Sequence, residues 1–474
     1  MKKTKLNQFI YLLMVAHVCH GQFFYIDDQE SKYWLQTNFS SFNKLDIFPS
    51  NKWLTYGINK NIRQKEGHSF GAFIHLKNQN NLKGIIQKSD YIGNGLLSAY
   101  RYTSPHIEIM NTMFFTDDVN NAERGFVRTI KNVTMYTNQA YLKVNNQSDK
   151  FNYSLKIGRD FITVGHSFNS NLFISDFSRP FDQFTLHAEL GKLNALFSVI
   201  ELDTIMDHNR YLYIHSFGYK SKKLSITVGE SVLASGVSKP INIQFLNPFS
   251  FWAWENLGST TKGLNAFLYA GITWLPINGL RIYGETIIDD INFHQDDAFY
   301  LNRFGYLIGV QRTGFPFESS NLWIEYSNVL HQVYQSYHPT HIYTHRGFPI
   351  GHFLGNDFIN IKIHYSQLMQ FGKIKPIIDI SYLMDGANGL ETRFDNPWET
   401  EEGEFLKDYI PPTHPSPPVT TWIESEVGAE IKIGFAAYLT ITAHYQLKSM
   451  EKASVTDMGI GIRFWSYFQL PFNK

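Results

Sequence analysis

Charged and titratable side chains interrupt or end many of the stretches in which apolar and polar residues alternate. Alternation alone does not require them, so they are the first places to look for chemistry. Opposite charges held close together form ion pairs, and two facing carboxylates can share a proton. We expect either an internal ion network or a polar ligand-contacting surface from these candidate residues: Arg159, Asp160, Arg210, His215, Glu230, Glu285, Asp289 and Glu325.

A second group of polar side chains lies between residues 331 and 346, which are rich in His and Tyr. A metal site needs ligands that converge and are held by further hydrogen bonds. The spacing of the four histidines on one loop (His331, His338, His341 and His345) does not indicate this, so we predict no metal ion. The tyrosines are typical either of a membrane-interface girdle or of rings that stack on a sugar. The candidate sugar-contacting residues are Tyr334, Tyr337, His338, Tyr343 and Arg346.

Sequence signatures of common enzymes are absent. The chain contains no GxSxG, HExxH, P-loop or EF-hand pattern. Asp289 and Asp290 resemble a catalytic carboxylate pair, but neighbouring residues in a strand point to opposite faces. We therefore predict a non-catalytic protein that needs no cofactor.

Strands must position these side chains, because period-two alternation recurs along the chain. Leu264–Trp274 alternates for eleven residues, about the length that a tilted strand needs to cross a bilayer. Residues 151–158, 359–366, 439–448 and 458–465 alternate in the same way. Counting such runs predicts about 16–18 antiparallel strands, in keeping with the even strand numbers of bacterial outer-membrane barrels.

Composition favours a membrane barrel over a large soluble β-sandwich. Aromatic residues make up 16% of the chain, with 39 Phe, 27 Tyr and 9 Trp. Barrels concentrate aromatic side chains at both membrane interfaces. A membrane helix would need an apolar run of about 18 residues, and the chain has none after the expected signal peptide. The predicted fold is an all-β, antiparallel transmembrane β-barrel of the outer membrane.

A charge on the lipid-facing side of such a barrel is costly, at about 2–4 kcal/mol for Arg or Lys near the midplane. We therefore expect the charged strand residues to face the lumen or to lie at the rims. Arg159 and Arg210 are expected to pair with inward carboxylates such as Glu230 or Glu285.

The ends and one internal stretch suggest the domain organisation. Residues 1–21 are typical of a cleaved signal peptide, with three lysines before an apolar run. Residues 22–68 are interpreted as a plug or periplasmic segment, and 69–474 as the barrel. The acidic and proline-rich stretch 391–420 is predicted to be a long external loop, because proline interrupts strand pairing.

Removal of the signal peptide would also remove Cys19, the only cysteine, and the lysines at 2, 3 and 5. The mature chain would then carry 39 Lys and Arg against 42 Asp and Glu, a net charge of −3. This balance is not that of a nucleic-acid-binding protein. The loss of the only cysteine excludes disulfides, so burial or a closed sheet must hold the exported protein together.

Three stretches resemble a known family. IGRDFITVGHSFNSNLFISDFSRPFDQF (157–184), the region 223–256 and YTHRGFPIGHFLGND (343–357) are similar to Wzi-type capsule assembly proteins of Bacteroidetes. The similarity runs from about Phe151 to the C-terminus. The helical bundle and plug of the enterobacterial lectin are not evident. The matching positions are Gly158, Arg159, Asp160, Gly165, Asp176, Pro180, Phe181, Asp182, Glu230, Asn247, Pro248, Asp289, Asp290, Pro349, Gly351 and Gly355.

This resemblance implies an outer-membrane barrel that binds surface polysaccharide and helps to assemble or retain it. The implied partners are the polysaccharide, outer-membrane lipid and the barrel-assembly machinery, with no nucleic acid. The alternatives are a porin-like solute channel and an accessory barrel of gliding or surface-adhesin machinery. An open lumen would favour the channel, and a filled lumen would favour the other two.

Overall fold

The protein is described here from a computed structural model. It describes residues 24–25, 53–54, 67–78, 95–116, 128–130, 133–146, 148, 151–175, 177–238, 240–252, 264–290, 302–317, 319–369, 373–390, 392, 413–433, 437–450 and 453–472. The expected signal peptide lies outside these residues, as do most of the N-terminal segment and most of the 391–420 loop. In the N-terminal segment, β1 (Phe24–Tyr25) pairs with β2 (Trp53–Leu54).

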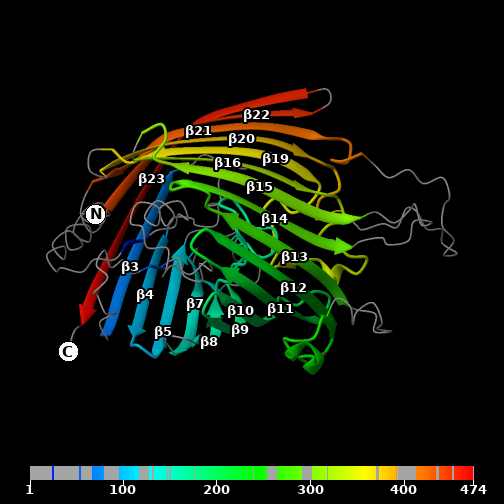
Figure 1. The fold of residues 1–474 in the computed structure, drawn as a ribbon. Helices are drawn as coiled ribbons and strands as arrows, with labels where there is room; N and C mark the ends of the chain where they lie inside the picture. Colours follow the sequence, from blue (N-terminus) through cyan, green and yellow to red (C-terminus); the bar gives the residue numbers. More distant parts are fainter. Residues whose placement is uncertain are drawn as a thin grey trace.

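Antiparallel hydrogen bonds join the longer strands into one closed barrel (Figure 1). The ring holds nineteen strands within the described residues, and one of them, β6, has only three residues, so eighteen full strands form the wall. This confirms the predicted all-β antiparallel barrel. The first half of the wall comprises β3 (Gly67–Asn78), β4 (Gly95–Thr103), β5 (Ile107–Thr116), β6 (Arg128–Ile130), β7 (Val133–Asn146), β8 (Phe151–Asp160), β9 (Phe181–Leu190), β10 (Leu193–Glu201), β11 (His208–Lys220) and β12 (Leu224–Val237).

The second half of the wall continues in the same up-and-down order, and its last strand pairs with β3 to close the ring. It comprises β13 (Leu264–Trp274), β14 (Leu280–Asp290), β15 (Arg303–Thr313), β16 (Ser320–Val329), β19 (Phe358–Gln367), β20 (Ile374–Asp385), β21 (Thr420–Lys432), β22 (Ala437–Met450) and β23 (Ala453–Phe472). Between β16 and β19 lie η4 (Pro339–His341), β17 (Thr344–His345) and β18 (Phe348–Pro349), and η3 (Ile243–Leu246) follows β12.

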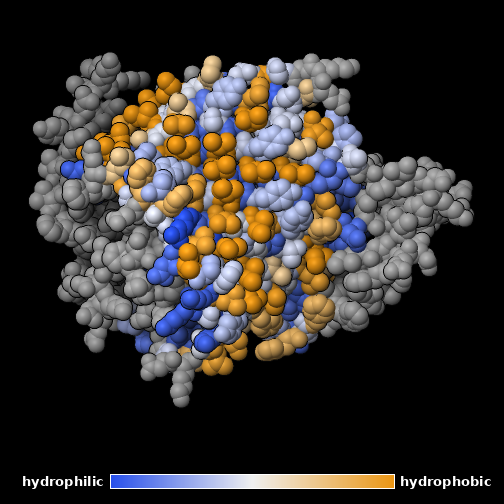
Figure 2. All heavy atoms as spheres, turned by 45° about the horizontal axis from the view of Figure 1, so that its top comes forward, coloured by the Kyte–Doolittle hydropathy of each residue, from blue (hydrophilic) through white to orange (hydrophobic). Residues whose placement is uncertain are grey.

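Alternation along the strands divides the wall into two faces. Apolar side chains point outward, as at Ile226 and Val228 of β12, which are 38% and 48% exposed. Their neighbours Ser225 and Thr227 are buried inside the barrel. Hydrophobic side chains accordingly gather over the outer wall in Figure 2. This arrangement suits a wall that meets lipid outside and a polar interior.

The long connections share one end of the barrel, which we call the long-loop end. Those after β8, β12, β14, β16 and β20 lie there, whereas the turns after β9, β11 and β13 span a few residues at the opposite end. Outer-membrane barrels place long connections outside the cell and short turns in the periplasm. We therefore expect the long-loop end to face the exterior. Among the described residues no helix has the length and hydropathy to cross a membrane.

Candidate functional site

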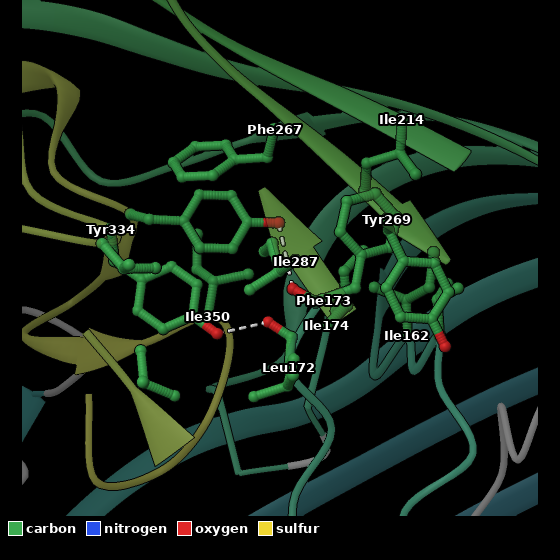
Figure 3. Close-up of a cluster of buried hydrophobic side chains, with 14 of the residues drawn as sticks. Ile162, Leu172, Phe173, Ile174, Ile214, Phe267, Tyr269, Ile287, Tyr334 and Ile350 are labelled. Atoms are coloured by element: carbon green, nitrogen blue, oxygen red, sulfur yellow. Dashed lines mark hydrogen bonds between the residues drawn. The ribbon is translucent and has the colours of Figure 1, made fainter. Parts of the chain in front are cut away.

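The chain itself occupies the lumen. Residues 161–180, which join β8 to β9, fold inward and are almost wholly buried from 162 to 175. Residues 330–357, which join β16 to β19, fold inward from the same end. We call these the β8–β9 segment and the β16–β19 segment. Their apolar side chains form one core with inward residues of the wall (Figure 3), among them Leu172, Phe173, Phe267, Ile287 and Ile350.

Glu285 of β14 anchors the β8–β9 segment. It is 4% exposed, and its carboxylate accepts backbone N–H groups from three residues of that segment. His166 and Ser167 donate to Oε1, with Ser167 at 2.7 Å, and Leu172 donates to Oε2 at 2.8 Å. A buried carboxylate needs such donors, because an unpaired charge in a low-dielectric interior is costly. Glu285 therefore lies in the lumen as predicted, but it binds backbone amides instead of an arginine.

Glu325 of β16 holds the same segment from the next part of the wall. Its Oε2 accepts the Ser167 hydroxyl at 2.6 Å and the Tyr283 hydroxyl at 2.8 Å. The His166 ring contacts the hydroxyls of Thr273 and Thr227 at 2.8 and 3.1 Å. Burial, with a smaller effect of the nearby Arg281 guanidinium, lowers the pKa of His166 to about 3, so the ring is neutral.

The β16–β19 segment packs on the β8–β9 segment through two tyrosines. The Tyr334 hydroxyl donates to the Leu172 carbonyl at 2.5 Å, and the Tyr343 hydroxyl donates to the Phe173 carbonyl at 3.1 Å (Figure 3). Both rings are 0% exposed, and burial raises the pKa of each phenol above its usual range. The prediction that Tyr334 and Tyr343 stack on a sugar is therefore wrong, because fully buried rings offer no surface to a sugar.

Arg210 of β11 fixes the far end of the β16–β19 segment. Its guanidinium donates to the carbonyls of Thr340, Ile342 and Thr344, at 2.7, 2.6 and 3.1 Å, and to Asp203 Oδ1 at 3.1 Å. It is 1% exposed and faces the lumen. Arg210 thus lies inside as predicted, but its predicted pairing with Glu230 or Glu285 is wrong.

His215 and Glu230 lie on the other face of the wall. They are direct neighbours across β11 and β12, and they share their faces with the exposed Phe217 and Val228. His215 Nε2 lies 2.8 Å from Glu230 Oε1, yet the two residues are only 5% and 1% exposed. The expectation that both face the lumen is therefore wrong.

Residues 240–252, which follow β12, cover this outward pair and are called the cover segment. The Trp252 ring stacks on His215 with centroids 4.1 Å apart, and the Trp252 backbone N–H donates to Glu230 Oε1 at 2.6 Å. Trp252 and Phe245 belong to a small core, separate from the lumen core, that includes Tyr213 and Val232. Pairing and cover together remove the penalty that a bare charge would meet in lipid.

The other predicted charged residues divide between the rim and the lumen. Arg159 lies at the end of β8 on the outward face and donates through Nε to Asp182 Oδ1 at 2.9 Å. Asp160 is fully buried and pairs with Lys156 and Gln139. Asp289 accepts the Tyr334 backbone N–H at 2.8 Å. The arginine at 159 therefore pairs across the rim, and both aspartates support the interior.

Three of the predicted sugar-contacting residues remain at the surface. Tyr337 is 62% exposed and packs edge-on against His338, which is also exposed. Arg346 is half-buried, and Arg159, Asp182, Asp203 and Arg179 act on its charge. Burial and the neighbouring arginines lower the pKa of Arg346, and the aspartates oppose this shift. The long-loop end thus combines an exposed ring with a group of arginines.

Several contributors were missed in the sequence. Ser167, Tyr283 and Arg281 show no unusual pattern, and their roles depend on a segment that is folded back from a distant part of the chain. Trp252 and Asn247 belong to the dense Asn, Pro and Trp cluster after β12, which alternation does not require. That cluster was a usable signal for the cover segment.

These features define an all-β barrel of the outer-membrane type with chain folded inside its lumen. No protein-family model and no curated protein sequence matches the chain. Among solved structures, it is similar to Wzi of Escherichia coli, described as an outer-membrane protein involved in group 1 capsule assembly and a carbohydrate-binding β-barrel. The TM-score is 0.58 at 14% identity, covering 86% of this chain and 85% of Wzi.

Two further solved structures are also similar, at lower TM-scores. OccD3 of Pseudomonas aeruginosa has a TM-score of 0.45 at 12% identity, over 86% of this chain and 92% of that one. OccAB4 of Acinetobacter baumannii has a TM-score of 0.47 at 9% identity, over 87% and 100%. At 14% identity the similarity to Wzi establishes the fold alone.

Proposed function

We propose that this barrel binds a surface polysaccharide at its long-loop end and helps to assemble or retain it, without catalysis, in the outer membrane. The observation that carries the proposal is the occupied lumen. Glu285, Glu325 and Arg210 all direct their hydrogen bonds to inward-folded chain. A solute channel instead needs polar groups turned toward an open path of water.

The binding surface is proposed at the exposed part of the β16–β19 segment. Tyr337 and His338 supply accessible rings, and the half-buried Arg346 supplies positive charge near the rim. Arginine recognises carboxylate and phosphate groups through paired donors. An acidic glycan is therefore the favoured ligand class. The similarity in fold to Wzi, whose description names it a carbohydrate-binding barrel, also supports this proposal.

The test uses the full-length protein purified in detergent and capsular polysaccharide extracted from the strain that carries it. A Tyr337→Ala, His338→Ala, Arg346→Ala triple variant is expected to bind at least about tenfold more weakly. Lys222→Ala removes one positive charge from a turn at the opposite end and is the matched control. Equal binding by the triple variant and the wild type would exclude this surface.

Conductance separates the proposal from the channel alternative. The purified barrel in a planar bilayer is expected to show no steady ion current, because both inward segments occupy the lumen. Stable, salt-dependent conductance by the wild type would make the solute channel the better description. Loss of the glycan from the cells of a deletion strain, with normal amounts of other outer-membrane proteins, would support retention in vivo.

A further inference from the structure

Three side chains from two connections meet at the rim of the long-loop end. His331 follows β16, Asp357 precedes β19 and His414 precedes β21. One potential ligand atom from each lies within 4.8 Å of the others, which is the only such group of three His, Cys, Asp or Glu residues among the described parts of the chain. His331 and Asp357 are buried, and His414 is half-buried.

The hydrogen bonds of His414 fix which of its nitrogens is available. Its Nε2 lies 2.9 Å from Asn328 Oδ1, while the Asn328 amide nitrogen faces the hydroxyls of Tyr326 and Tyr306 at 3.2 and 3.4 Å. This network assigns Nε2–H as a donor to the amide oxygen, so Nδ1 of the neutral ring carries a lone pair. A carbonyl-type acceptor on one nitrogen is the usual way in which a metal-binding imidazole is oriented.

That lone pair points at a carboxylate. His414 Nδ1 lies 3.4 Å from Asp357 Oδ1. Two electron-rich atoms at this separation repel each other unless a proton or a metal ion lies between them. Asp357 is held in place by the backbone N–H groups of Ser416 and Asn388, both at 2.9 Å, and has a φ of 59°, which is unusual for a residue other than glycine. The carboxylate is thus fixed beside the imidazole.

His331 supplies the second, independent observation. His331 is 8% exposed, and neither ring nitrogen has a hydrogen-bond partner among the described residues. A buried, unpartnered imidazole is unfavourable. Asp385 also acts on Asp357 as a like charge, which adds negative potential. Arg303 adds positive potential near His331. Asp290 partly offsets this charge, because its Oδ2 lies 4.0 Å from Arg303 Nη2.

We propose that His331, Asp357 and His414 bind one divalent metal ion of the zinc type. Two imidazoles and a carboxylate are ligands that Zn²⁺ accepts, with metal–ligand distances of about 2.0–2.2 Å and neighbouring ligands therefore about 3.4 Å apart. The His414–Asp357 separation already has this value, and His331 needs to approach by at most about 1.4 Å, because its ligand atom lies within 4.8 Å of the other two. The ion would be coordinated by the Nδ1 lone pair of His414 and by one unpartnered ring nitrogen of His331.

The proposed ion would cross-link the β16–β19 segment and the residues directly before β21. His331 and Asp357 lie at the two ends of the β16–β19 segment, and His414 belongs to the β20–β21 connection. Binding would therefore stabilise the base of the segment that carries Tyr337 without using any of the proposed glycan-contacting residues. The metal site stands independently of the proposed function.

The test measures metal binding by the full-length barrel in detergent after chelation with EDTA. Calorimetric titration with Zn²⁺ is expected to show one ion per chain, and Co²⁺ should give the visible absorption of a four-coordinate site. His331→Gln and His414→Gln are each expected to weaken binding at least tenfold. His106→Gln, in a short turn at the opposite end, is the matched control and should bind as the wild type does.

Each outcome decides the proposal. Should the wild type bind no ion, or should both histidine variants bind as well as His106→Gln does, the three residues form no metal site and His414 and Asp357 share a proton. If His414→Gln does not fold, His331→Gln suffices, because the His331 ring makes no hydrogen bond within the described structure. The increase in melting temperature with Zn²⁺ should be absent in that variant.

Discussion

At the scale of single residues, a carboxylate that accepts backbone amides acts as a point of attachment for a segment. Glu285 does this for three donors, and Arg210 does the reverse by donating to three carbonyls. Hydrogen bonds to a charged group contribute about 1.5–3 kcal/mol, and a donor left unsatisfied by truncation costs about 1–3 kcal/mol. Single substitutions at these points should therefore loosen the interior while leaving the wall intact.

Glu285→Gln tests this attachment. The amide side chain keeps one acceptor and places an NH₂ group against a backbone donor, so at least one of the three bonds is lost. We expect exchange of the Ser167 and Leu172 amide hydrogens to become about 10–100-fold faster, equivalent to about 1.4–2.8 kcal/mol. Glu189→Gln, near the opposite end of β9, is the control. Unchanged protection of both amides would contradict the assigned role.

A second prediction concerns the stability that the outward pair of His215 and Glu230 gives to the barrel. His215→Leu leaves a carboxylate on the lipid-facing side with fewer partners and should destabilise the barrel by about 3 kcal/mol, as measured by urea unfolding in lipid vesicles. Adding Glu230→Leu removes that stranded charge. The double variant should therefore recover at least about 1 kcal/mol relative to His215→Leu alone. No recovery would mean that the pair does not behave as a shielded ion pair.

Part of this pair's location could be predicted from the sequence. Glu230 has the same parity along β12 as Ile226 and Val228, which alone assigns it to the apolar face. The general rule that lipid excludes charge suggested the lumen instead. What overrides the rule is Trp252, which is 22 residues away and covers the pair. Local pattern assigns a face reliably, but it contains no information about a connection folded back over that face.

At the scale of elements, the strands were predictable and the connections were not. The predicted Leu264–Trp274 strand matches β13, and residues 359–366 lie within β19. Alternation over ten residues is sufficient because each side chain responds to its own side of the wall. The β8–β9 and β16–β19 segments have no such period, since their side chains meet partners from many strands. For that reason the sequence predicts exposed rings at Tyr334 and Tyr343, although both are buried.

The β8–β9 segment should respond to acid through His166. The folded-state pKa of about 3 lies below the usual 6.5, so the undocked segment binds the proton more readily. Its docked state is therefore fully stable above about pH 6.5 and loses about 1.4 kcal/mol per pH unit below it, down to about pH 3. Arg281 and Glu285 form their hydrogen bonds with the backbone of His166, so these bonds do not compensate the positive charge of a protonated ring.

Hydrogen exchange of Leu172 and Ile174 between pH 7 and pH 5, corrected for the intrinsic rate, measures this loss. We expect protection to fall by about 25-fold in the wild type and to change much less in His166→Gln, whose amide can still contact Thr227 and Thr273. The same pH dependence in both proteins would assign the effect to another group.

At the scale of the whole molecule, the closed wall with an apolar exterior predicts where the protein resides. Fractionation of cells should recover it in the outer membrane, folded and resistant to denaturation by detergent at room temperature. Boiling should change its electrophoretic mobility, because a closed barrel keeps its hydrogen bonds until heated. Recovery as a soluble periplasmic monomer would contradict the assignment of the apolar face to lipid.

The occupied lumen also imposes an order on folding. The bonds that hold the β8–β9 segment join residues far apart in the chain: Leu172 and Glu285 are separated by 113 residues, Ser167 and Glu325 by 158, and Asn169 and Lys362 by 193. The segment leaves the wall after β8, but its partners arrive only with β14, β16 and β19. Because such distant contacts form only after long loops have closed, the segment docks late. Until then its backbone donors must remain in water, so the growing sheet has to stay open on one side for most of its assembly.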